Sequence, residues 1–219
     1  MKVSFIGAGN VAWHLSQAFE DAGHYIEEIY SRDPQRARLL VGQLYDARIQ
    51  PDLHLADSQA DLIVLAVNDS SIENVVQRAV FPEGSLVVHT SGATSLADLE
   101  QWVSVYSDVY LRTGVLYPLQ TFSKADRLDY ARIPFGVEAN DPDTEAVLIQ
   151  LARSVSKQVY QISSAERAVL HTAAVFANNF STHLLGLARD ILDHEQLPFE
   201  LLKPLIEQTF LKALASDNP

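Results

Sequence analysis

Short apolar runs alternate with amphipathic stretches along the first 110 residues of the chain. The segments DLIVLAV (61–67) and SLVVHTS (85–91) contain continuous aliphatic runs, which are typical of strands covered on both faces of a parallel sheet. Two earlier strands are predicted at KVSFIG (2–7) and YIEEIYS (25–31). Amphipathic stretches predict helices over residues 11–22, 34–43, 71–79 and 96–103. Because strands and helices alternate in the order βαβα, we predict an α/β fold with a doubly wound sheet.

The pattern changes after residue 162. Before it, strands are predicted within YLRTGVLYPLQTF, IPFGVEA and KQVYQIS, with a helix over residues 144–156. Beyond it, a helical stretch runs to about His194, and Pro198 and Pro204 suit the first turns of a short and a longer helix. We therefore predict a sheet domain over residues 1–161 and an α-helical C-terminal domain over residues 162–219.

Serine residues followed three positions later by an acid predict capping boxes at helix starts. In such a box the hydroxyl and the carboxylate accept hydrogen bonds from backbone amides that the helix leaves free. The pairs with this spacing are Ser70 with Glu73, Ser95 with Asp98, and Ser163 with Glu166.

Composition narrows the class of protein. The 219 residues carry 16 Lys and Arg against 28 Asp and Glu, and a net charge of −12 disfavours nucleic-acid partners. The absence of cysteine excludes disulfides, thiolate metal sites and a cysteine nucleophile. No metal site is predicted. No apolar run reaches the ~20 residues needed to cross a bilayer, and the chain does not begin like a signal peptide, so we expect a cytoplasmic protein.

A glycine-rich turn follows the first predicted strand. FIGAGNVAWHL fits the pattern G-x-G-x-x-A at Gly7, Gly9 and Ala12, with residues for a tight turn, a close approach to pyrophosphate and close helix packing. The helix beginning near Asn10 or Val11 then offers free amides to a phosphate. A tight turn with no ligand is the alternative interpretation. Because the turn joins a strand to a helix in a βαβ unit, we predict dinucleotide binding.

The end of the second strand bears on the identity of the dinucleotide. Ser31 and Arg32 stand where NAD-binding chains place an acid, and a hydroxyl with a guanidinium suits a 2′-phosphate. Arg36 lies one helical turn further on. The alternative is that Ser31 and Asp33 cap the next helix while Arg32 is solvated. We favour NADP(H) over NAD(H). We expect Val67, at the end of the third predicted strand, and Asn68, which follows it, to contact the dinucleotide.

Candidate chemistry lies at the carboxyl ends of the strands, where open α/β sheets bind ligands. His89 and Ser91 follow the aliphatic run SLVV (85–88), and either can serve a substrate or only the local backbone. The stretch from Ala168 to Ala177 is apolar on nearly all sides, which predicts a buried helix.

Polar residues interrupt that helical stretch along one line. At ~100° per residue, His171, Asn178 and Thr182 project within about 20° of one direction. They form either a structural network or one wall of a cleft. The segment after residue 162 is rich in leucine and phenylalanine yet too short to bury both sides of its helices, so we expect a homodimer.

Five motifs occur in order along the chain: IGAGNVAWHL, YSR, HTSGATSLADL, GVLYPLQTF and FANNF. Together they resemble the Rossmann-like NADP-dependent oxidoreductases that carry a C-terminal domain of unknown function. That family is allied to pyrroline-5-carboxylate reductase, ketopantoate reductase and the β-hydroxyacid dehydrogenases. The resemblance covers nearly the whole chain. It implies an N-terminal NADP-binding domain and dimerisation through the C-terminal helices, but no particular substrate.

The chain departs from the family pattern at Tyr117, where relatives typically have histidine in His-Pro-Leu-Gln-Thr-Phe. A tyrosine can donate a hydrogen bond, but it does not exchange protons near neutral pH unless its pKa is strongly lowered. More distant dehydrogenases use a lysine one turn before an asparagine, yet Ala174 and Val175 precede Asn178 and Asn179 by four positions. The chain ends at SDNP where relatives continue, so we expect a truncated C-terminus or a missing piece of the site.

We predict an NADP(H)-dependent oxidoreductase that transfers a hydride to or from a small carbonyl or imine substrate in a cleft between domains. Ser91, His171 and Asn178 are the candidate substrate contacts, with His171 as proton donor. The absent lysine and Tyr117 leave a noncatalytic NADP(H)-binding sensor or scaffold dimer as the alternative. A dimerisation module whose glycine turn binds nothing is a third possibility.

Overall fold

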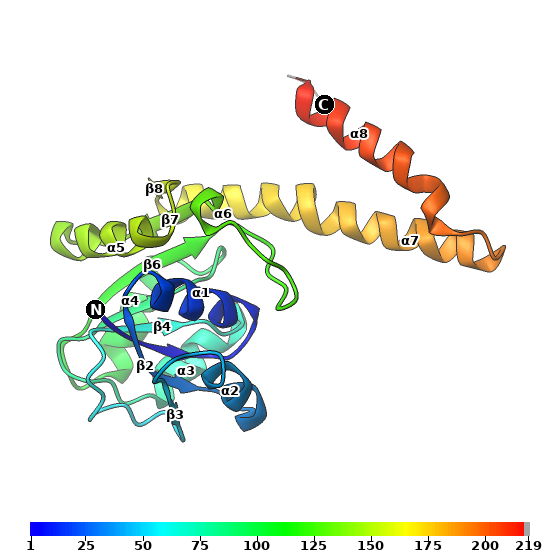
Figure 1. Ribbon diagram of the computed structural model, residues 1–219. Helices are drawn as coiled ribbons and strands as arrows, with labels where there is room; N and C mark the ends of the chain where they lie inside the picture. The colour runs from blue at the N-terminus through cyan, green and yellow to red at the C-terminus, as the bar shows by residue number, and fades with distance from the viewer. Residues whose placement is uncertain (217–219) are drawn as a thin grey trace. The chain divides into compact units, whose positions relative to one another are not determined.

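The computed structural model describes residues 1–216, and this part of the chain contains one eight-stranded sheet (Figure 1). The strands lie in the order β3-β2-β1-β4-β5-β6-β7-β8, and all neighbours are parallel except β6 and β7. Their bounds are β1 Lys2–Ile6, β2 Tyr25–Tyr30, β3 Arg48–Gln50, β4 Leu62–Leu65, β5 Leu86–His89, β6 Arg112–Pro118, β7 Phe135–Glu138 and β8 Val159–Gln161. The chain runs outward from β1 to β3 and returns to β4 on the other side of β1, so the topological switch point lies between β1 and β4. The predicted α/β class with a doubly wound, Rossmann-like sheet is confirmed.

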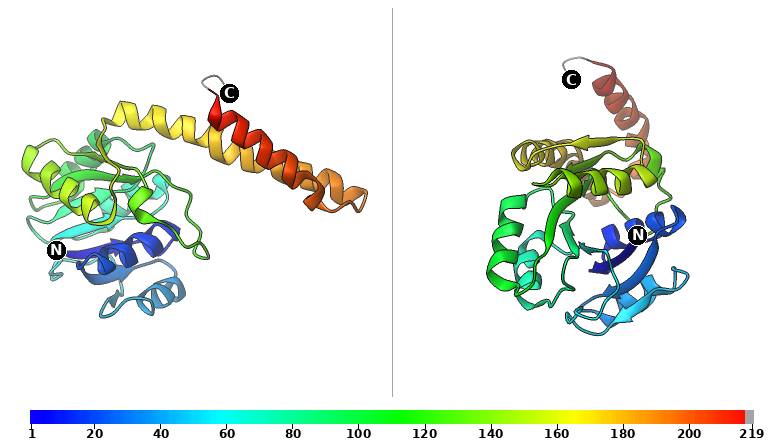
Figure 2. Two further views of the ribbon diagram at one scale, coloured as in Figure 1. Left: turned by 45° about the horizontal axis from the view of Figure 1, so that its top comes forward. Right: turned by 90° about the vertical axis from the view of Figure 1, so that its left-hand side faces the viewer.

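Helices cover both faces of the sheet (Figure 2). They are α1 Asn10–Asp21, α2 Pro34–Val41, α3 Ile72–Arg78, α4 Leu96–Tyr106, α5 Pro142–Val155 and α6 Ser164–Ala174. Helices α1, α2 and α5 pack with Phe5 and Val64 on one face, while α3 and α4 pack with Ile6 and Leu65 on the other. Neighbouring residues of one strand thus enter opposite cores, which explains why these strands are apolar without interruption.

Two of the three predicted capping boxes are confirmed. Ser95 and Asp98 exchange hydrogen bonds at the start of α4, as do Ser163 and Glu166 before α6. The box predicted at Ser70 and Glu73 is wrong. A 3-10 turn at Asp69–Ser71 moves the start of α3 to Ile72, and no side chain caps it.

The described chain forms two compact units, residues 1–171 and residues 172–216. The last strand ends at Gln161, where the domain boundary was predicted, but the first unit continues into α6 as far as His171. The reason is Arg167, which is 1% exposed, pairs with the carboxylate of Glu138 and donates from Nη2 to the carbonyl of Thr94 at 2.6 Å. This buried arginine ties α6 to the sheet. The domain bounds themselves stay a prediction.

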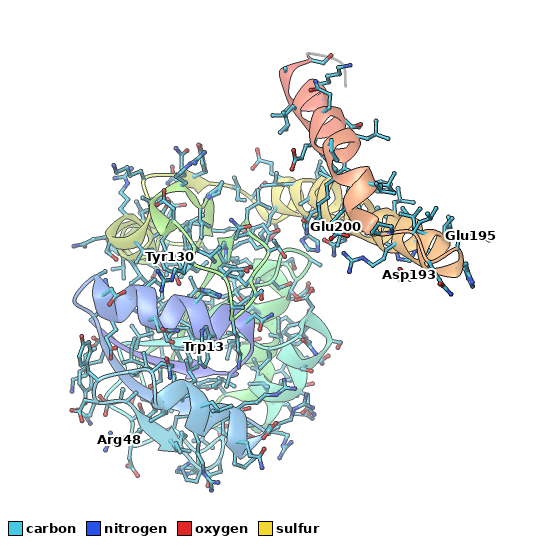
Figure 3. All side chains as sticks on the ribbon, turned by 45° about the vertical axis from the view of Figure 1, so that its right-hand side comes forward. Trp13, Arg48, Tyr130, Asp193, Glu195 and Glu200 are labelled. Atoms are coloured by element: carbon cyan, nitrogen blue, oxygen red, sulfur yellow. The ribbon has the colours of Figure 1, made fainter. Side chains whose placement is uncertain are left out.

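The second unit consists of helical segments. They are a π-helix at Val175–Phe180, α7 Ser181–His194, a 3-10 turn at Phe199–Leu202 and α8 Lys203–Ala215. Asp193, Glu195 and Glu200 lie around the turn that joins α7 to α8 (Figure 3). None of the residues 172–216 is buried.

The prediction of a buried helix from Ala168 to Ala177 is wrong for the single chain. Val169 is 72% exposed and Phe176 is 65% exposed within residues 1–216. Among residues 1–216, no helix is long and apolar enough to cross a membrane. The expected truncation of the C-terminus falls on residues 217–219, which lie outside the described residues.

Candidate functional site

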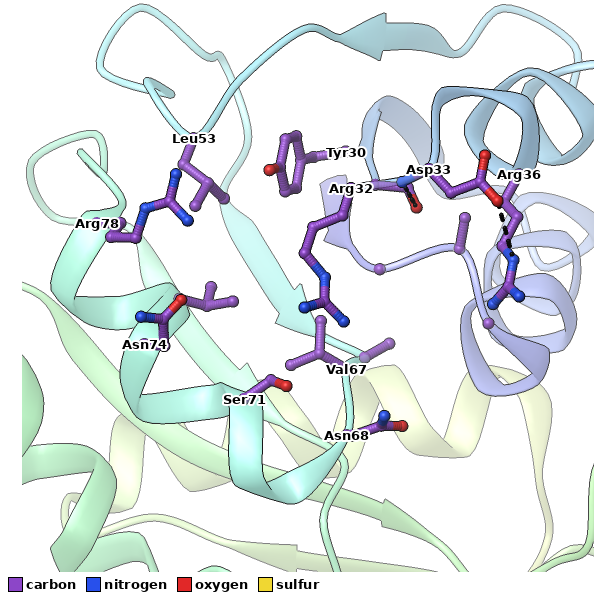
Figure 4. Close-up of a pocket in the computed structure, with 16 residues that line it drawn as sticks. Tyr30, Arg32, Asp33, Arg36, Leu53, Val67, Asn68, Ser71, Asn74 and Arg78 are labelled. Atoms are coloured by element: carbon purple, nitrogen blue, oxygen red, sulfur yellow. Dashed lines mark hydrogen bonds and ion pairs between the residues drawn. The ribbon is translucent and has the colours of Figure 1, made fainter.

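A cavity of about 520 Å³ opens at the carboxyl ends of β1, β2 and β4, beside the topological switch point (Figure 4). Its floor is the glycine turn and its walls are the loops that follow β2 and β4. The lining includes Gly7, Gly9, Ser31, Arg32, Val67 and Asn68, six of the residues predicted to bind the cofactor, together with Arg36. Open α/β sheets bind their ligands at this place.

The glycine turn has a backbone that only glycine can adopt at its first position. Gly7 has a φ of +119°, donates its N–H to the carbonyl of Tyr30 at 2.8 Å, and lies so close to β4 that a Cβ would be 2.2 Å from the carbonyl oxygen of Ala66. At Gly9, by contrast, a Cβ would meet no atom within 4 Å. The turn is therefore packed against the end of β4 at Gly7 and open at Gly9. The open side leaves room for a ligand group at the start of α1.

The first backbone N–H groups of helix α1 lack the side-chain hydrogen-bond acceptor that usually caps a helix. Gly9 is its N-cap, no side chain caps it, and its first turn holds no acidic residue. The predicted contacts Asn10, Val11 and Ala12 form this first turn, and Ala12 is fully buried against the sheet, as its small size predicts. Free amides and the positive end of the helix dipole fit a phosphate, so these residues match a dinucleotide.

Arginines surround the other end of the cavity. In Figure 4 the guanidinium groups of Arg32 and Arg78 point into it from two sides, while Nε of Arg36 pairs with Oδ2 of Asp33 at 3.3 Å. Among residues 1–216, neither Arg32 nor Arg78 forms an ion pair. In a chain with a net charge of −12, this arrangement fits an anionic ligand.

The structure shows the local capping contacts at the end of β2, while the contact of Ser31 and Arg32 with a 2′-phosphate stays a prediction. Asp33 does cap α2, accepting from the amide of Gln35 at 2.9 Å, and Oγ of Ser31 accepts from the amide of Asp33 at 3.2 Å. Yet Arg32 faces the cavity, and Glu27 lies within β2, buried and paired with Arg48. The carboxylate that lines the cavity beyond β2 is that of Asp33, which caps α2 and pairs with Arg36.

Arg78 lines the cavity although its place in the sequence does not indicate a site residue. It is the last residue of α3, where a basic side chain is ordinarily explained by the helix dipole. Ser71 and Asn74 from the same helical segment also line the cavity. The order of strands in the sheet places α3 opposite the loop that follows β2. This order brings Arg78 and Arg32 to the same cavity, and it cannot be read from the sequence near either residue.

A second polar group lies further along the same edge of the sheet. The hydroxyl of Tyr117, in β6, is 3.0 Å from Nδ1 of His171, in α6. Gly92, in the turn after β5, packs under the imidazole, and a Cβ there would be 2.4 Å from Nδ1. The structure thus joins the residue that departs from the family pattern to the predicted proton donor.

His89 is a buried structural residue. It is fully buried, and its Nδ1 accepts from the amide of Ser91 at 3.2 Å. Burial lowers the pKa of His89 to about 3, assisted by the charge of Arg167. The ring is therefore neutral at all physiological pH values, and it shapes the turn rather than exchanging protons.

Ser91 is engaged in that turn. Its Oγ accepts from the amides of Ala93 at 3.1 Å and Thr94 at 2.9 Å, and the residue is 5% exposed. This is the local backbone role that serine often has in turns. A contact of its hydroxyl with substrate stays a prediction.

Asn178 belongs to the second unit. It lies within the π-helix at Val175–Phe180, where its Nδ2 donates to Oδ1 of Asn179 at 3.0 Å and its carbonyl accepts from Thr182 at 2.9 Å. The predicted polar line assumed 100° per residue throughout, and a π-helix does not follow that spacing. The role of Asn178 in substrate contact stays a prediction.

Comparison with known families adds to this geometry. Residues 1–103 match the model of a Rossmann-like domain, and residues 133–219 match a domain of unknown function (DUF2520). A crystal structure from Bacteroides fragilis, described as a "putative NADP oxidoreductase", is 35% identical over 99% of this chain and 81% of that chain, with a TM-score of 0.87. The chain belongs to the family of Rossmann-like proteins with this C-terminal domain.

More distant structures share the fold of this family member. A 1-pyrroline-5-carboxylate reductase from Streptococcus pyogenes is 16% identical over 100% of this chain and 82% of that chain, with a TM-score of 0.71. A reductive aminase from Aspergillus terreus, in complex with NADPH and ethyl-5-oxohexanoate, is 15% identical over 98% and 73%, also with a TM-score of 0.71. No curated protein matches the chain.

Proposed function

We propose that the protein is an NADP(H)-dependent oxidoreductase acting on a small carbonyl or imine compound. The observation that carries the proposal is the cavity at the switch point, where an uncapped helix start meets unpaired arginines in an acidic chain. When bound, the nicotinamide supplies or accepts the hydride. The chain's own part is to bind, orient and stabilise charge.

Binding is assigned to two parts of the cavity. The amides around Gly9, Asn10 and Val11 would hold the pyrophosphate, and Gly7 and Ala12 keep that turn close to the sheet. Ser31 and Arg32 would hold the 2′-phosphate that distinguishes NADP(H) from NAD(H). Val67 and Asn68 would then border the dinucleotide between these parts and the strand ends further along.

His171 is our candidate for the group that faces the reacting carbonyl oxygen or imine nitrogen. It belongs to the first unit and is half-buried, with one ring nitrogen bonded to Tyr117. Imines are included among the substrates because two structures with this fold are named pyrroline-5-carboxylate reductase and reductive aminase. Asn178 and Ser91 are predicted contacts that Asn178→Ala and Ser91→Ala test separately.

The direct test is to offer the protein a panel of keto acids, ketones and cyclic imines with NADPH. Turnover of each compound is measured as the loss of NADPH absorbance. We expect at least one class to be reduced, and His171→Ala to lower kcat by about 100-fold with the affinity for NADPH unchanged. Tight NADPH binding without turnover of any compound would contradict the proposal and favour a sensor or scaffold. Absence of a thermal shift with NADPH would contradict both.

We also propose that a second copy of the chain covers the second unit. Its residues 172–216 bury nothing, while Leu184, Ile191, Leu205 and Leu211 are each at least 63% exposed. So few residues without a core do not hold a fold alone, and an apolar face of this kind pairs best with its own copy. Light scattering should give a dimer for wild type and a monomer for Leu184→Glu/Ile191→Glu, whereas Glu195→Gln stays dimeric. A monomeric wild type would contradict this.

A further inference from the structure

Of the five histidines in the first unit, His14, His89 and His171 differ in what their ring nitrogens bind. His14 uses both nitrogens, with the Tyr130 hydroxyl 2.9 Å from Nδ1 and the Ser123 carbonyl 2.8 Å from Nε2. His89 is fully buried. His171 has one nitrogen bonded, to Tyr117, and within the part of the chain that the structure describes its Nε2 makes no hydrogen bond. His171 is thus the histidine of the three with a nitrogen available to a ligand.

The chemistry of the pair gives the hydrogen bond a direction. Tyr117 is only 7% exposed, and a buried phenol needs an acceptor for its hydrogen. Burial raises the pKa of Tyr117 above its ordinary value, so its hydroxyl stays protonated. A neutral imidazole nitrogen is a strong acceptor and a phenol oxygen is a weak one. The Tyr117 hydroxyl therefore donates to Nδ1, which leaves the ring hydrogen on Nε2.

The ring is also held in place from below. A Cβ on Gly92 would lie 2.4 Å from Nδ1 and 2.6 Å from Cγ of His171, so the bare backbone of this turn supports the imidazole. The turn follows β5, and β5 pairs with β4 so that His89 is beside Leu65. Gly92 follows the end of β5 by three residues, as Asn68 follows the end of β4, so both belong to loops at the carboxyl edge of neighbouring strands.

We propose that Tyr117 is a positioning residue that fixes His171 as a neutral hydrogen-bond donor, with Nε2–H presented to the carbonyl oxygen of the substrate. The proposal rests on the proposed function. When hydride adds to the carbonyl carbon, the electron pair of the C=O bond moves to the oxygen. Nε2–H stabilises that charge, and water supplies the proton that the oxygen finally takes. A neutral imidazole in such a role needs its hydrogen on a defined nitrogen, which the tyrosine provides.

Nitrogen-15 NMR of the histidine rings at pH 8 tests the pair without any substrate. His171→Asn identifies the His171 resonances. We expect the hydrogen on Nε2 and an unprotonated, hydrogen-bonded Nδ1, and we expect Tyr117→Phe to shift the Nδ1 resonance toward that of a free nitrogen. Tyr130→Phe is the matched control, because it removes the same kind of bond at His14 and should leave His171 unchanged. A hydrogen found on Nδ1, or His171 resonances that Tyr117→Phe does not move, overturns the proposal.

Kinetics supply the second readout. With a keto acid and NADPH, Tyr117→Phe should lower kcat by about tenfold with the NADPH affinity unchanged, since one oriented hydrogen bond is lost. In wild type, a neutral donor predicts that kcat does not fall tenfold per pH unit above neutrality. Such a fall would show that His171 acts as an imidazolium acid and overturns the proposal. If no substrate is reduced, the proposed function is contradicted. The NMR result still decides whether Tyr117 donates to Nδ1 of His171.

Discussion

The two polar regions at the carboxyl edge of the sheet are built in different ways. In the cavity over β1, β2 and β4, the glycine turn and Arg32 come from the first βαβ unit, and α3 adds Arg78. The Tyr117–His171 pair depends on two side chains 54 positions apart, brought together by β6 and α6. The part of the cavity that fits a phosphate is thus encoded in one short segment, whereas Arg78 and the Tyr117–His171 pair depend on the assembled fold.

The largest effect should come from the glycine turn. Gly7→Ala places a Cβ 2.2 Å from a backbone oxygen at a φ of +119°, so we expect unfolding to become about 3 kcal/mol easier and NADPH binding to be lost. Gly9→Ala is the matched control for folding. Its Cβ meets no atom of the chain, so stability should be unchanged while the methyl group obstructs the phosphate. Chemical denaturation and NADPH titration measure the two effects, and wild-type binding by Gly9→Ala would argue against a phosphate at this turn.

The next largest effects are expected on nucleotide affinity when Arg32 or Arg78 is replaced. Arg32→Gln should weaken NADPH binding by about 30-fold and leave NADH binding unchanged, because the lost partner is the 2′-phosphate. Arg78→Gln, on the opposite wall, should weaken NADPH binding by about fivefold.

Arg153→Gln is the control for a change of charge. Arg153 is exposed in the last turn of α5, away from the cavity lining, so its substitution should have no effect on either nucleotide. Equal losses of NADPH and NADH in Arg32→Gln would mean that Arg32 does not contact the 2′-phosphate.

Gly92→Ala tests the Tyr117–His171 pair. The added methyl group displaces the His171 ring, so turnover should fall by about tenfold at unchanged NADPH affinity. Combined with His171→Ala, it should cost nothing more than His171→Ala alone, because both act through the same ring. Additive losses in the double variant would place the effect of Gly92 elsewhere.

A last prediction concerns the pH dependence of stability and does not involve the nucleotide cavity. His89 has a pKa of about 3 in the folded chain, below its ordinary value of 6.5, so between these pH values the unfolded chain binds a proton that the folded chain excludes. The free energy of unfolding should therefore fall as the pH is lowered through this window, by up to about 1.4 kcal/mol per pH unit. His89→Asn keeps an acceptor for the amide of Ser91. Its free energy of unfolding should fall less steeply with decreasing pH than that of wild type, by the contribution of His89. Equal slopes would contradict the buried neutral state.

Much of the fold was predictable because its signals are local. Continuous aliphatic runs identify the central strands, and the glycine spacing identifies the turn at Gly7. The edge strand Arg48–Gln50 was missed, since three residues without an apolar pattern carry no strand signal. The π-helix at Val175–Phe180 was missed because its residues are ordinary helix residues in sequence.

The site was predictable in part for the same reason. Arg32 stands at a fixed place after a strand, whereas Arg78 and Tyr117 acquire their roles only through the order of strands in the sheet. The exposure of the segment around Phe176 was also not predictable, since an apolar helix has the same pattern whether its own chain or a second copy covers it.

Calorimetric titration of the wild-type protein with NADPH and, separately, with NADH decides whether the cavity selects for a 2′-phosphate. We expect one site per chain for NADPH and a dissociation constant for NADH at least about tenfold larger, because only NADPH carries the 2′-phosphate that we propose Arg32 and Ser31 bind. Equal affinity for the two nucleotides, or binding of neither, would contradict the proposed NADP(H) site.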